Sequence, residues 1–156
     1  MPDSTTMKTP STTERVRRNT AQEINSEIER SGRQNVHRFA GAGPDLIARR
    51  LAQLDQEWDV ERALEANAAV AMLAGLGLGL AISRRLLIIP ALVGGFLLQH
   101  AIQGWCPPVP IMRRLRFRTA SEIARERYAL KALRGDFQPA GPDGVPTPDR
   151  AWNAAE

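Results

Sequence analysis

The chain has little of what catalytic, metal-binding or disulfide-stabilised proteins depend on. Its 156 residues contain one cysteine, Cys106, and two histidines. A single cysteine excludes a disulfide within the chain, so cysteine pairing does not report the redox compartment. Cys106 with the nearby His100 gives at most two protein ligands, which is too few for a typical zinc site. We therefore expect no catalytic residue, no metal site and no cofactor.

Aromatic residues are also scarce, at 5% of the chain, with a single tyrosine. The formal charge is +4, which fits nucleic acid, an anionic membrane surface or no specific partner. The basic residues are not interleaved with aromatic ones, and no zinc-finger spacing is present. We therefore expect no nucleic-acid partner and attribute the basic residues near the apolar segments to membrane topology.

Charged residues are missing from two stretches in the middle of the chain. No Asp, Glu, Lys or Arg occurs in residues 66–83 or in residues 86–112. A soluble core of this length would place its apolar residues periodically among charged ones. Because the apolar residues are concentrated and both ends are polar, the negative mean hydropathy averages two unlike regions. This distribution predicts an integral membrane protein.

The two stretches have the length of membrane-spanning helices. Residues 66–83 would form about 27 Å of helix and residues 86–105 about 30 Å, against a hydrocarbon core of about 30 Å. The first is rich in alanine and glycine, whereas the second is more apolar and carries Pro90 in its first turns, where a missing N–H is least costly. Only Arg84 and Arg85 follow Ser83 before the second stretch, so we expect an antiparallel hairpin.

Helical extensions are expected on both sides of the hairpin, which makes the chain all-α. The two ends of the chain are rich in Ser, Thr, Pro or Gly and are expected to be disordered. The expected segments are a disordered tail (1–19), a cytoplasmic helical segment (20–62), the transmembrane hairpin (63–112), a basic juxtamembrane helix (113–137) and a second disordered tail (138–156).

Capping and helix-breaking residues place the flanking helices. Thr20 with Glu23, and Thr119 with Glu122, have the spacing of capping boxes, in which the two side chains satisfy backbone N–H groups. Pro44 can open a further helix because its missing N–H costs nothing at the first helical position. We expect that helix to lead directly into the first apolar stretch.

Positive charge predicts the orientation of the hairpin. Seven arginines flank the apolar stretches, whereas the connector carries two, Arg84 and Arg85. Because positive residues are retained on the cytoplasmic side, both termini are expected in the cytoplasm. Residues 1–62 contain no apolar signal sequence, so the first apolar stretch is expected to act as an uncleaved membrane signal. The flanking arginines are Arg49, Arg50, Arg62, Arg113, Arg114, Arg116 and Arg118.

Residues at the ends of the hairpin are candidate membrane-surface anchors. Trp105 lies at the end of the second stretch, where an indole favours the headgroup level. Arginines near anionic headgroups contribute about 1 kcal/mol each. The candidate anchors are Arg84, Arg85, Trp105, Arg113, Arg114, Arg116 and Arg118.

Small residues at every fourth position indicate close helix packing. Ala71, Gly75 and Gly79 form one small-xxx-small ridge, and Ala91 with Gly95 forms another. Such ridges let helix backbones approach closely, either within one hairpin or between two hairpins. A dinucleotide-binding loop is not expected, because the glycines lie in a helical stretch that no acidic ribose partner follows.

His100 and Cys106 are the candidate ionisable residues. A histidine within a membrane span is a functional hypothesis by default, and the alternative is a neutral His100 hydrogen-bonded across the helix pair or near the interface. Cys106 follows a helix C-terminus, whose negative partial charge disfavours the thiolate, while the nearby arginines favour it. Both a reactive and an unreactive thiol remain open.

The exit from the second stretch resembles that of a known family. Two short apolar helices, a tight basic connector and the sequence Gly-Trp-Cys-Pro at residues 104–107 resemble the YgaP-like inner-membrane domain, a two-helix family of unknown function. The resemblance covers about residues 58–118. It implies a bacterial inner membrane and dimerisation through the helices. In some members the hairpin follows a rhodanese sulfurtransferase domain, which these 156 residues do not contain, so a sulfur-related role is implied by association only.

The leading hypothesis is a non-enzymatic, multi-pass membrane hairpin that anchors or organises cytoplasmic helical flanks. Its expected partners are the lipid bilayer and a second copy of the chain. One alternative is a membrane-bound thiol or sulfur-handling component that uses Cys106 with His100. The other is a soluble helical bundle that buries the apolar stretches.

Overall fold

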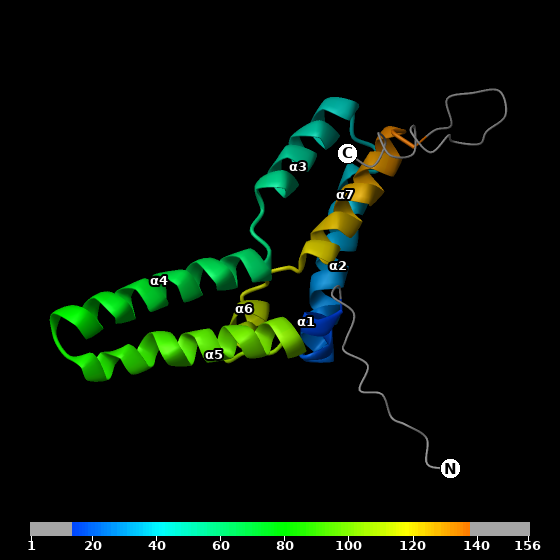
Figure 1. Ribbon diagram of the computed structural model, residues 1–156. Helices are drawn as coiled ribbons and strands as arrows, with labels where there is room; N and C mark the ends of the chain where they lie inside the picture. Colours follow the sequence, from blue (N-terminus) through cyan, green and yellow to red (C-terminus); the bar gives the residue numbers. More distant parts are fainter. Residues whose placement is uncertain (1–13, 138–156) are drawn as a thin grey trace, which may run out of the picture. The chain divides into compact units, whose positions relative to one another are not determined.

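The computed structural model describes residues 14–137, and all regular elements in this range are helices, which confirms the expected all-α class for these residues (Figure 1). No strand occurs among them. The expected tail at residues 138–156 lies outside the described residues, as do residues 1–13. The elements are α1 (Arg15–Arg18), α2 (Gln22–Phe39), α3 (Pro44–Gln56), α4 (Val60–Ala81), the 3₁₀ turn η1 (Arg84–Leu87), α5 (Ile88–Gln103), α6 (Pro108–Arg114) and α7 (Ala120–Arg134).

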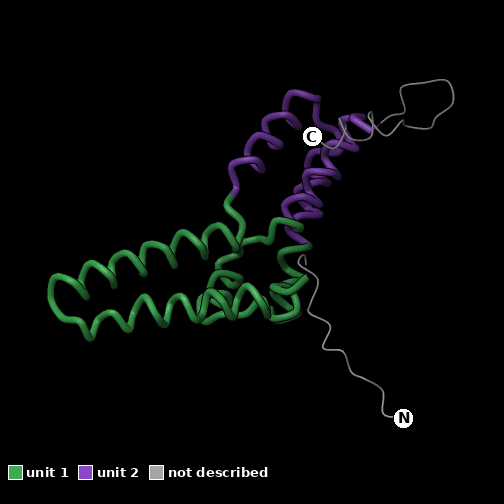
Figure 2. The backbone as a smooth tube through the Cα atoms, in the orientation of Figure 1, with its two compact units in different colours: residues 1–29, 58–121 green, residues 30–57, 122–156 purple. Residues whose placement is uncertain are grey.

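The described chain forms two compact units (Figure 2). The first unit contains residues 14–29 and 58–121, and the second contains residues 30–57 and 122–137. Each unit combines parts of the chain from both sides of the apolar stretches. The segments expected from the sequence were consecutive, so they did not predict that distant parts of the chain share one unit.

In the first unit, α4 and α5 lie side by side and are joined by η1 (Figure 1). α4 begins at Val60 because the Asp59 carboxylate caps it, accepting a hydrogen bond from the Arg62 amide at 2.7 Å. Glu57 and Asp59 have extended backbone, so the expected direct passage from the preceding helix into the apolar stretch is wrong. α5 ends at Gln103, where the next residue turns the chain.

The first unit has an apolar core at the end of α4 and α5 that is opposite η1. We call it the base core, and Leu97 and Phe117 pack against it. Val16 of α1 belongs to it, so the expected disordered tail at residues 1–19 is wrong for residues 15–19. One buried valine on a four-residue helix gives no periodic sequence signal. The buried residues of the base core are Val16, Val60, Ala63, Leu64, Cys106, Val109 and Met112.

One of the two expected capping boxes is wrong. The Thr20 hydroxyl donates to the carbonyl oxygen of Val16 at 2.8 Å, and α2 begins only at Gln22. Thr20 therefore completes the turn after α1. The other expected boundary holds, since α7 begins directly after Thr119 and ends before Gly135, whose φ of 90° is typical of a helix stop.

The second unit has a separate core between α3 and α7. Its buried apolar residues are Ile47, Leu51, Leu54, Ile123 and Leu130. Glu126 lies among them with only 1% of its side chain exposed, and it accepts hydrogen bonds from Nε and Nη2 of Arg50 at 2.9 and 2.8 Å. Removing one partner from such a buried pair typically costs about 3–5 kcal/mol. Arg50, counted among the topology-determining charges, is thus also a structural residue of α3.

Candidate functional site

The surface that α4 and α5 present is apolar. Two helical segments, one that ends with α4 at Ala81 and the other at Arg84–Gln103, are long and apolar enough to cross a membrane. Only 6% of the apolar window in the second segment is buried inside the protein, so α5 is not the buried core helix of this unit. The large apolar residues exposed on or beside α4 and α5 are Val70, Leu73, Leu76, Leu78, Leu80, Ile82, Ile88, Leu92, Phe96, Leu98 and Ile102.

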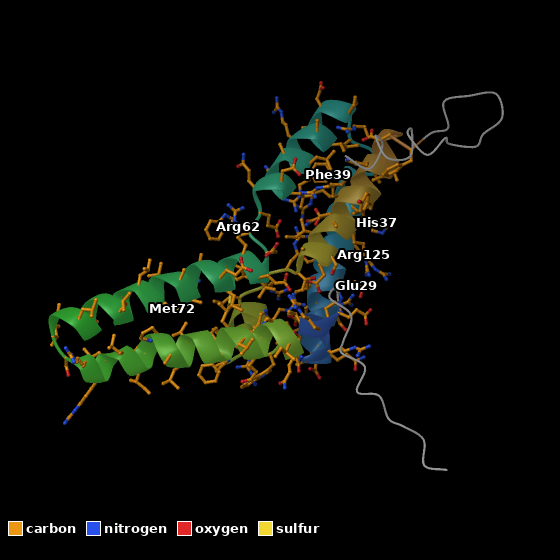
Figure 3. The ribbon with its side chains drawn as sticks, in the orientation of Figure 1. Glu29, His37, Phe39, Arg62, Met72 and Arg125 are labelled. Carbon is orange, nitrogen blue, oxygen red and sulfur yellow. The ribbon has the colours of Figure 1, made fainter. Side chains whose placement is uncertain are left out.

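Aromatic and charged residues border this apolar surface at both ends. Trp58 precedes α4 and Trp105 follows α5, and both are exposed. The Arg62 guanidinium lies 4.5 Å from the centroid of the Trp58 ring, in cation–π geometry (Arg62 is labelled in Figure 3). Arg84 and Arg85 are exposed in η1 at the opposite end. Trp105, Arg84 and Arg85 are thus exposed at the ends of α4 and α5, and their role as membrane-surface anchors stays a prediction.

Two of the four arginines that follow α5 are buried. Arg113 is fully buried, and its guanidinium donates to the Phe117 carbonyl oxygen at 2.9 Å and to Asn25 Oδ1 at 2.8 Å. Arg118 is also buried, and its carbonyl oxygen accepts a hydrogen bond from the Val60 amide at 2.8 Å. The expectation that both are membrane-surface anchors is therefore wrong, because the chain after α5 folds back onto the base core.

The remaining two arginines of that cluster, Arg114 and Arg116, are exposed. Arg116 has a positive φ of 67° and pairs with Glu27 at 3.0 Å, with both side chains more than half exposed. An exposed pair of this kind contributes at most about 1 kcal/mol. Both arginines are therefore placed to contact an outside partner.

The first small-residue ridge lies where α4 meets the start of α5. A Cβ added to Gly75 would lie 2.8 Å from Cδ of Pro90, and one added to Gly79 would lie 2.5 Å from Cδ2 of Leu87. Real Cβ atoms do not approach so closely, so a larger residue at either position would have to displace its neighbour on η1 or α5. Ala71, the third residue of the ridge, is half-buried.

The second ridge is on the wrong face for packing within the hairpin. Ala91 and Gly95 are exposed, and nothing lies within 4 Å of a Cβ added to Gly95. Gly94 faces α4 instead, because a Cβ added to it would lie 3.9 Å from Cε of Met72 (labelled in Figure 3). Of the two uses expected for Ala91 and Gly95, only contact between two hairpins is left.

A connection that the sequence did not predict holds α1 against the end of α5. The last carbonyl groups of a helix have no partner within the helix. Here Arg15 Nη1 donates to the Ala101 carbonyl oxygen at 2.9 Å, and Asn19 Nδ2 donates to that of Gln103 at 2.8 Å. Gly104 makes this possible, since its φ is 74° and an added Cβ would lie 2.6 Å from the Arg15 carbonyl carbon. In the sequence, the glycine at position 104 is the one residue that indicates such a close approach, because a side chain there would be strained.

His100 is buried beside this connection. Its side chain is 5% exposed, and neither ring nitrogen has a hydrogen-bond partner among residues 14–137. The expected hydrogen bond across the helix pair is therefore not formed. The charged groups that act on the ring are Arg15 from α1 and Glu61 and Glu65 from α4. An unsatisfied buried imidazole costs stability.

Cys106 lies in the base core and is almost completely buried. Burial raises the pKa of its thiol above the ordinary value, and a hydrogen bond with the Val109 backbone lowers it by a smaller amount. Both the burial and the raised pKa disfavour the nucleophilic thiolate at neutral pH. Among the described residues, no group of three or more His, Cys, Asp or Glu side chains could hold a metal ion.

The close approach at Gly75 predicts a position-specific effect of a larger side chain. Gly75→Leu must displace Pro90 and Ile89, so we expect the free energy of unfolding in detergent micelles to fall by about 1–3 kcal/mol. Gly77→Leu on the same helix is the matched control, because nothing lies within 4 Å of its added Cβ. Denaturant titrations followed by circular dichroism measure both. Equal losses for the two variants would contradict the packing.

The buried thiol predicts slow modification. We expect a maleimide probe at pH 7 to label Cys106 in the folded protein far more slowly than in the denaturant-unfolded chain, because both access and the thiolate fraction are low. Since its pKa is raised, the rate should increase only at a pH above the range of an ordinary thiol. Labelling as fast as that of the unfolded chain would show that Cys106 is accessible and reactive, and would support a thiol or sulfur-handling function.

No family model, curated protein or solved structure matches this chain.

Proposed function

We propose that this chain is an integral protein of a bacterial inner membrane, in which α4 and α5 cross the bilayer as a hairpin and anchor a helical unit on the cytoplasmic side. The observation that carries the proposal is the exposure of large apolar side chains around α4 and α5. In water such a surface would be a strong aggregation liability, whereas in hydrocarbon it needs no cover. The YgaP-like resemblance agrees with this location.

The dimensions and borders of the hairpin support the proposal. α4 has 22 residues and is about 33 Å long, and η1 with α5 covers a similar distance. Trp58 and Trp105 mark one end, and indoles are enriched at membrane–water interfaces. Arg84 and Arg85 place charge at the other end, where the apolar stretches stop. The acidic residues Glu61 and Glu65 lie near the tryptophan end, where α4 enters the base core.

The proposed orientation places both termini in the cytoplasm. Seven flanking arginines oppose two in the connector, and the rule counts positive residues near the spans during insertion, whether or not they are later buried. Arg113 and Arg118 therefore keep their influence on topology although they do not reach the headgroups. A cytoplasmic location would also keep Cys106 reduced.

We further propose that the hairpin pairs with a second copy of itself through α5. Ala91 and Gly95 are exposed there at a spacing that suits close helix approach. An anchoring or organising role needs such contacts rather than a catalytic site. The buried Cys106 offers no support for a thiol or sulfur-handling function.

Membrane insertion predicts resistance to alkaline extraction. We expect the chain to stay in the membrane pellet at high pH, and Leu76→Lys with Leu92→Lys to release it, because each lysine costs about 2.5–3.5 kcal/mol inside the bilayer. Leu46→Lys with Leu133→Lys is the control, since these leucines are similarly exposed but lie in the second unit. Release of the unmodified chain would identify it as a soluble bundle.

The orientation is testable with topology reporters. A reporter that is active only in the cytoplasm should be active when fused after Glu156, and a periplasm-specific reporter should be active when inserted between Arg84 and Arg85. This follows from the excess of flanking positive charge. Periplasmic activity after Glu156 would reverse the orientation without affecting the proposed membrane insertion.

A further inference from the structure

α6 (Pro108–Arg114) has two faces that differ in exposure although both are largely apolar. Val109 and Met112 are buried in the base core. Ile111 and Leu115, by contrast, are 62% and 68% exposed. Leu115 directly follows α6, and its amide donates to the Ile111 carbonyl oxygen at 3.0 Å, so it completes the last helical turn on the same side as Ile111. A short helix fixed by one face that exposes large apolar residues on the other presents an interaction surface.

Positive charge and an indole accompany these residues. Arg114 is exposed between Ile111 and Leu115 in the sequence, and Trp105 is exposed just before α6 begins. We call Ile111, Arg114 and Leu115 the outer face of α6, and the exposed Trp105 precedes it in the sequence. It follows directly on the exposed apolar surface of α5, which ends two residues before Trp105 at Gln103. An indole, aliphatic residues and arginine together are typical of segments that lie at a membrane interface.

We propose that the outer face of α6 lies in the headgroup layer of an anionic bilayer, next to the point where α5 leaves the hydrocarbon. The inference rests on the proposed function, because it takes α5 as a membrane span. Anionic lipid is the occupant that matches the charge of Arg114. A second copy related by a twofold axis would place the same patch against itself, and so would bring like charges together.

This contact would set the depth of the hairpin. The base core holds α6 through Val109 and Met112, and it also contains Val60 at the start of α4. The two apolar side chains of the outer face would enter the boundary between headgroups and acyl chains, where burial stabilises by about 25 cal/mol per Å². The interfacial anchor after α5 is then this face, rather than a row of four arginines.

Depth-dependent fluorescence quenching tests the inference on the full chain in vesicles. Single cysteines at Ile111→Cys, Leu92→Cys and Leu133→Cys, each in a Cys106→Ala background, carry an environment-sensitive dye. The vesicles contain phosphatidylcholine and phosphatidylglycerol, with nitroxides placed near the headgroups or deep in the acyl chains. Acrylamide serves as the aqueous quencher. Leu92 and Leu133 are exposed on α5 and α7, so they report the membrane and the aqueous reference.

We expect the dye at position 111 to be quenched more by shallow than by deep nitroxides, and its acrylamide quenching constant to be about threefold below that at position 133. The dye at position 92 should prefer the deep nitroxides. Acrylamide quenching at 111 equal to that at 133 overturns the inference while leaving membrane insertion intact. Protection at 111 from both lipid nitroxides and acrylamide also overturns it, because a protein would then cover the face.

The position 92 dye separates the two proposals. Its failure to respond to any lipid nitroxide would contradict the membrane hairpin itself. Should Cys106→Ala fail to fold, the same variants with Cys106 retained can be labelled briefly under native conditions. The lipid charge is tested by Arg114→Gln, which should raise acrylamide access at position 111 in anionic vesicles but not in purely phosphatidylcholine vesicles. An equal rise in both lipids would contradict the choice of anionic headgroups.

Discussion

The structure of the first unit depends on satisfying the backbone at the end of α5. The last carbonyl groups of a helix lack partners within the helix, so other groups must satisfy them. The chain solves this by bringing α1 against that end, where Arg15 and Asn19 donate to two of these carbonyl groups. The guanidinium also lies at the negative end of the helix dipole, which favours it further. Gly104 is what lets the two backbones approach this closely.

The rest of the base core follows from this constraint. Once α1 is held there, Val16 packs against residues from α4 and α6, and Arg15 also pairs with Glu61 at 2.8 Å. The same folding back of the chain buries Arg113, whose Nη1 and Nη2 donate to the Phe117 carbonyl oxygen and to Asn25 Oδ1. A buried arginine without such partners would be costly, so these contacts and the burial depend on each other. Hydrogen bonds from α1 to the end of α5, and from α6 to α2, thus hold the short helices in place around the base core.

Much of the chain's local structure could be predicted from its sequence, because its signals are strong and local. Two uncharged stretches, Pro44 at the start of α3 and Gly135 after α7 indicate helices and their limits without tertiary information. The fate of individual charges could not be predicted in this way. Arg113 and Arg114 are neighbours with the same local sequence context, yet one is buried and the other exposed. Likewise, the burial of Glu126 on the apolar face of α7 is explained only by its partner Arg50, which lies 76 positions away in the sequence.

The face of α5 that packs against α4 could not be predicted from the sequence, for a different physical reason. On α4 the two glycines at positions 75 and 79 identify the packed face, because small residues there contrast with large neighbours. α5 is apolar all round, and a helix of that kind carries no preferred direction in its composition. Ala91 and Gly95 were therefore as plausible a packing ridge as Gly94, and only the arrangement of Met72 and Pro90 distinguishes them. A helix uniformly apolar around its circumference suits an environment that is uniformly apolar, whereas α4, with its glycine face, is shaped for one neighbour, α5.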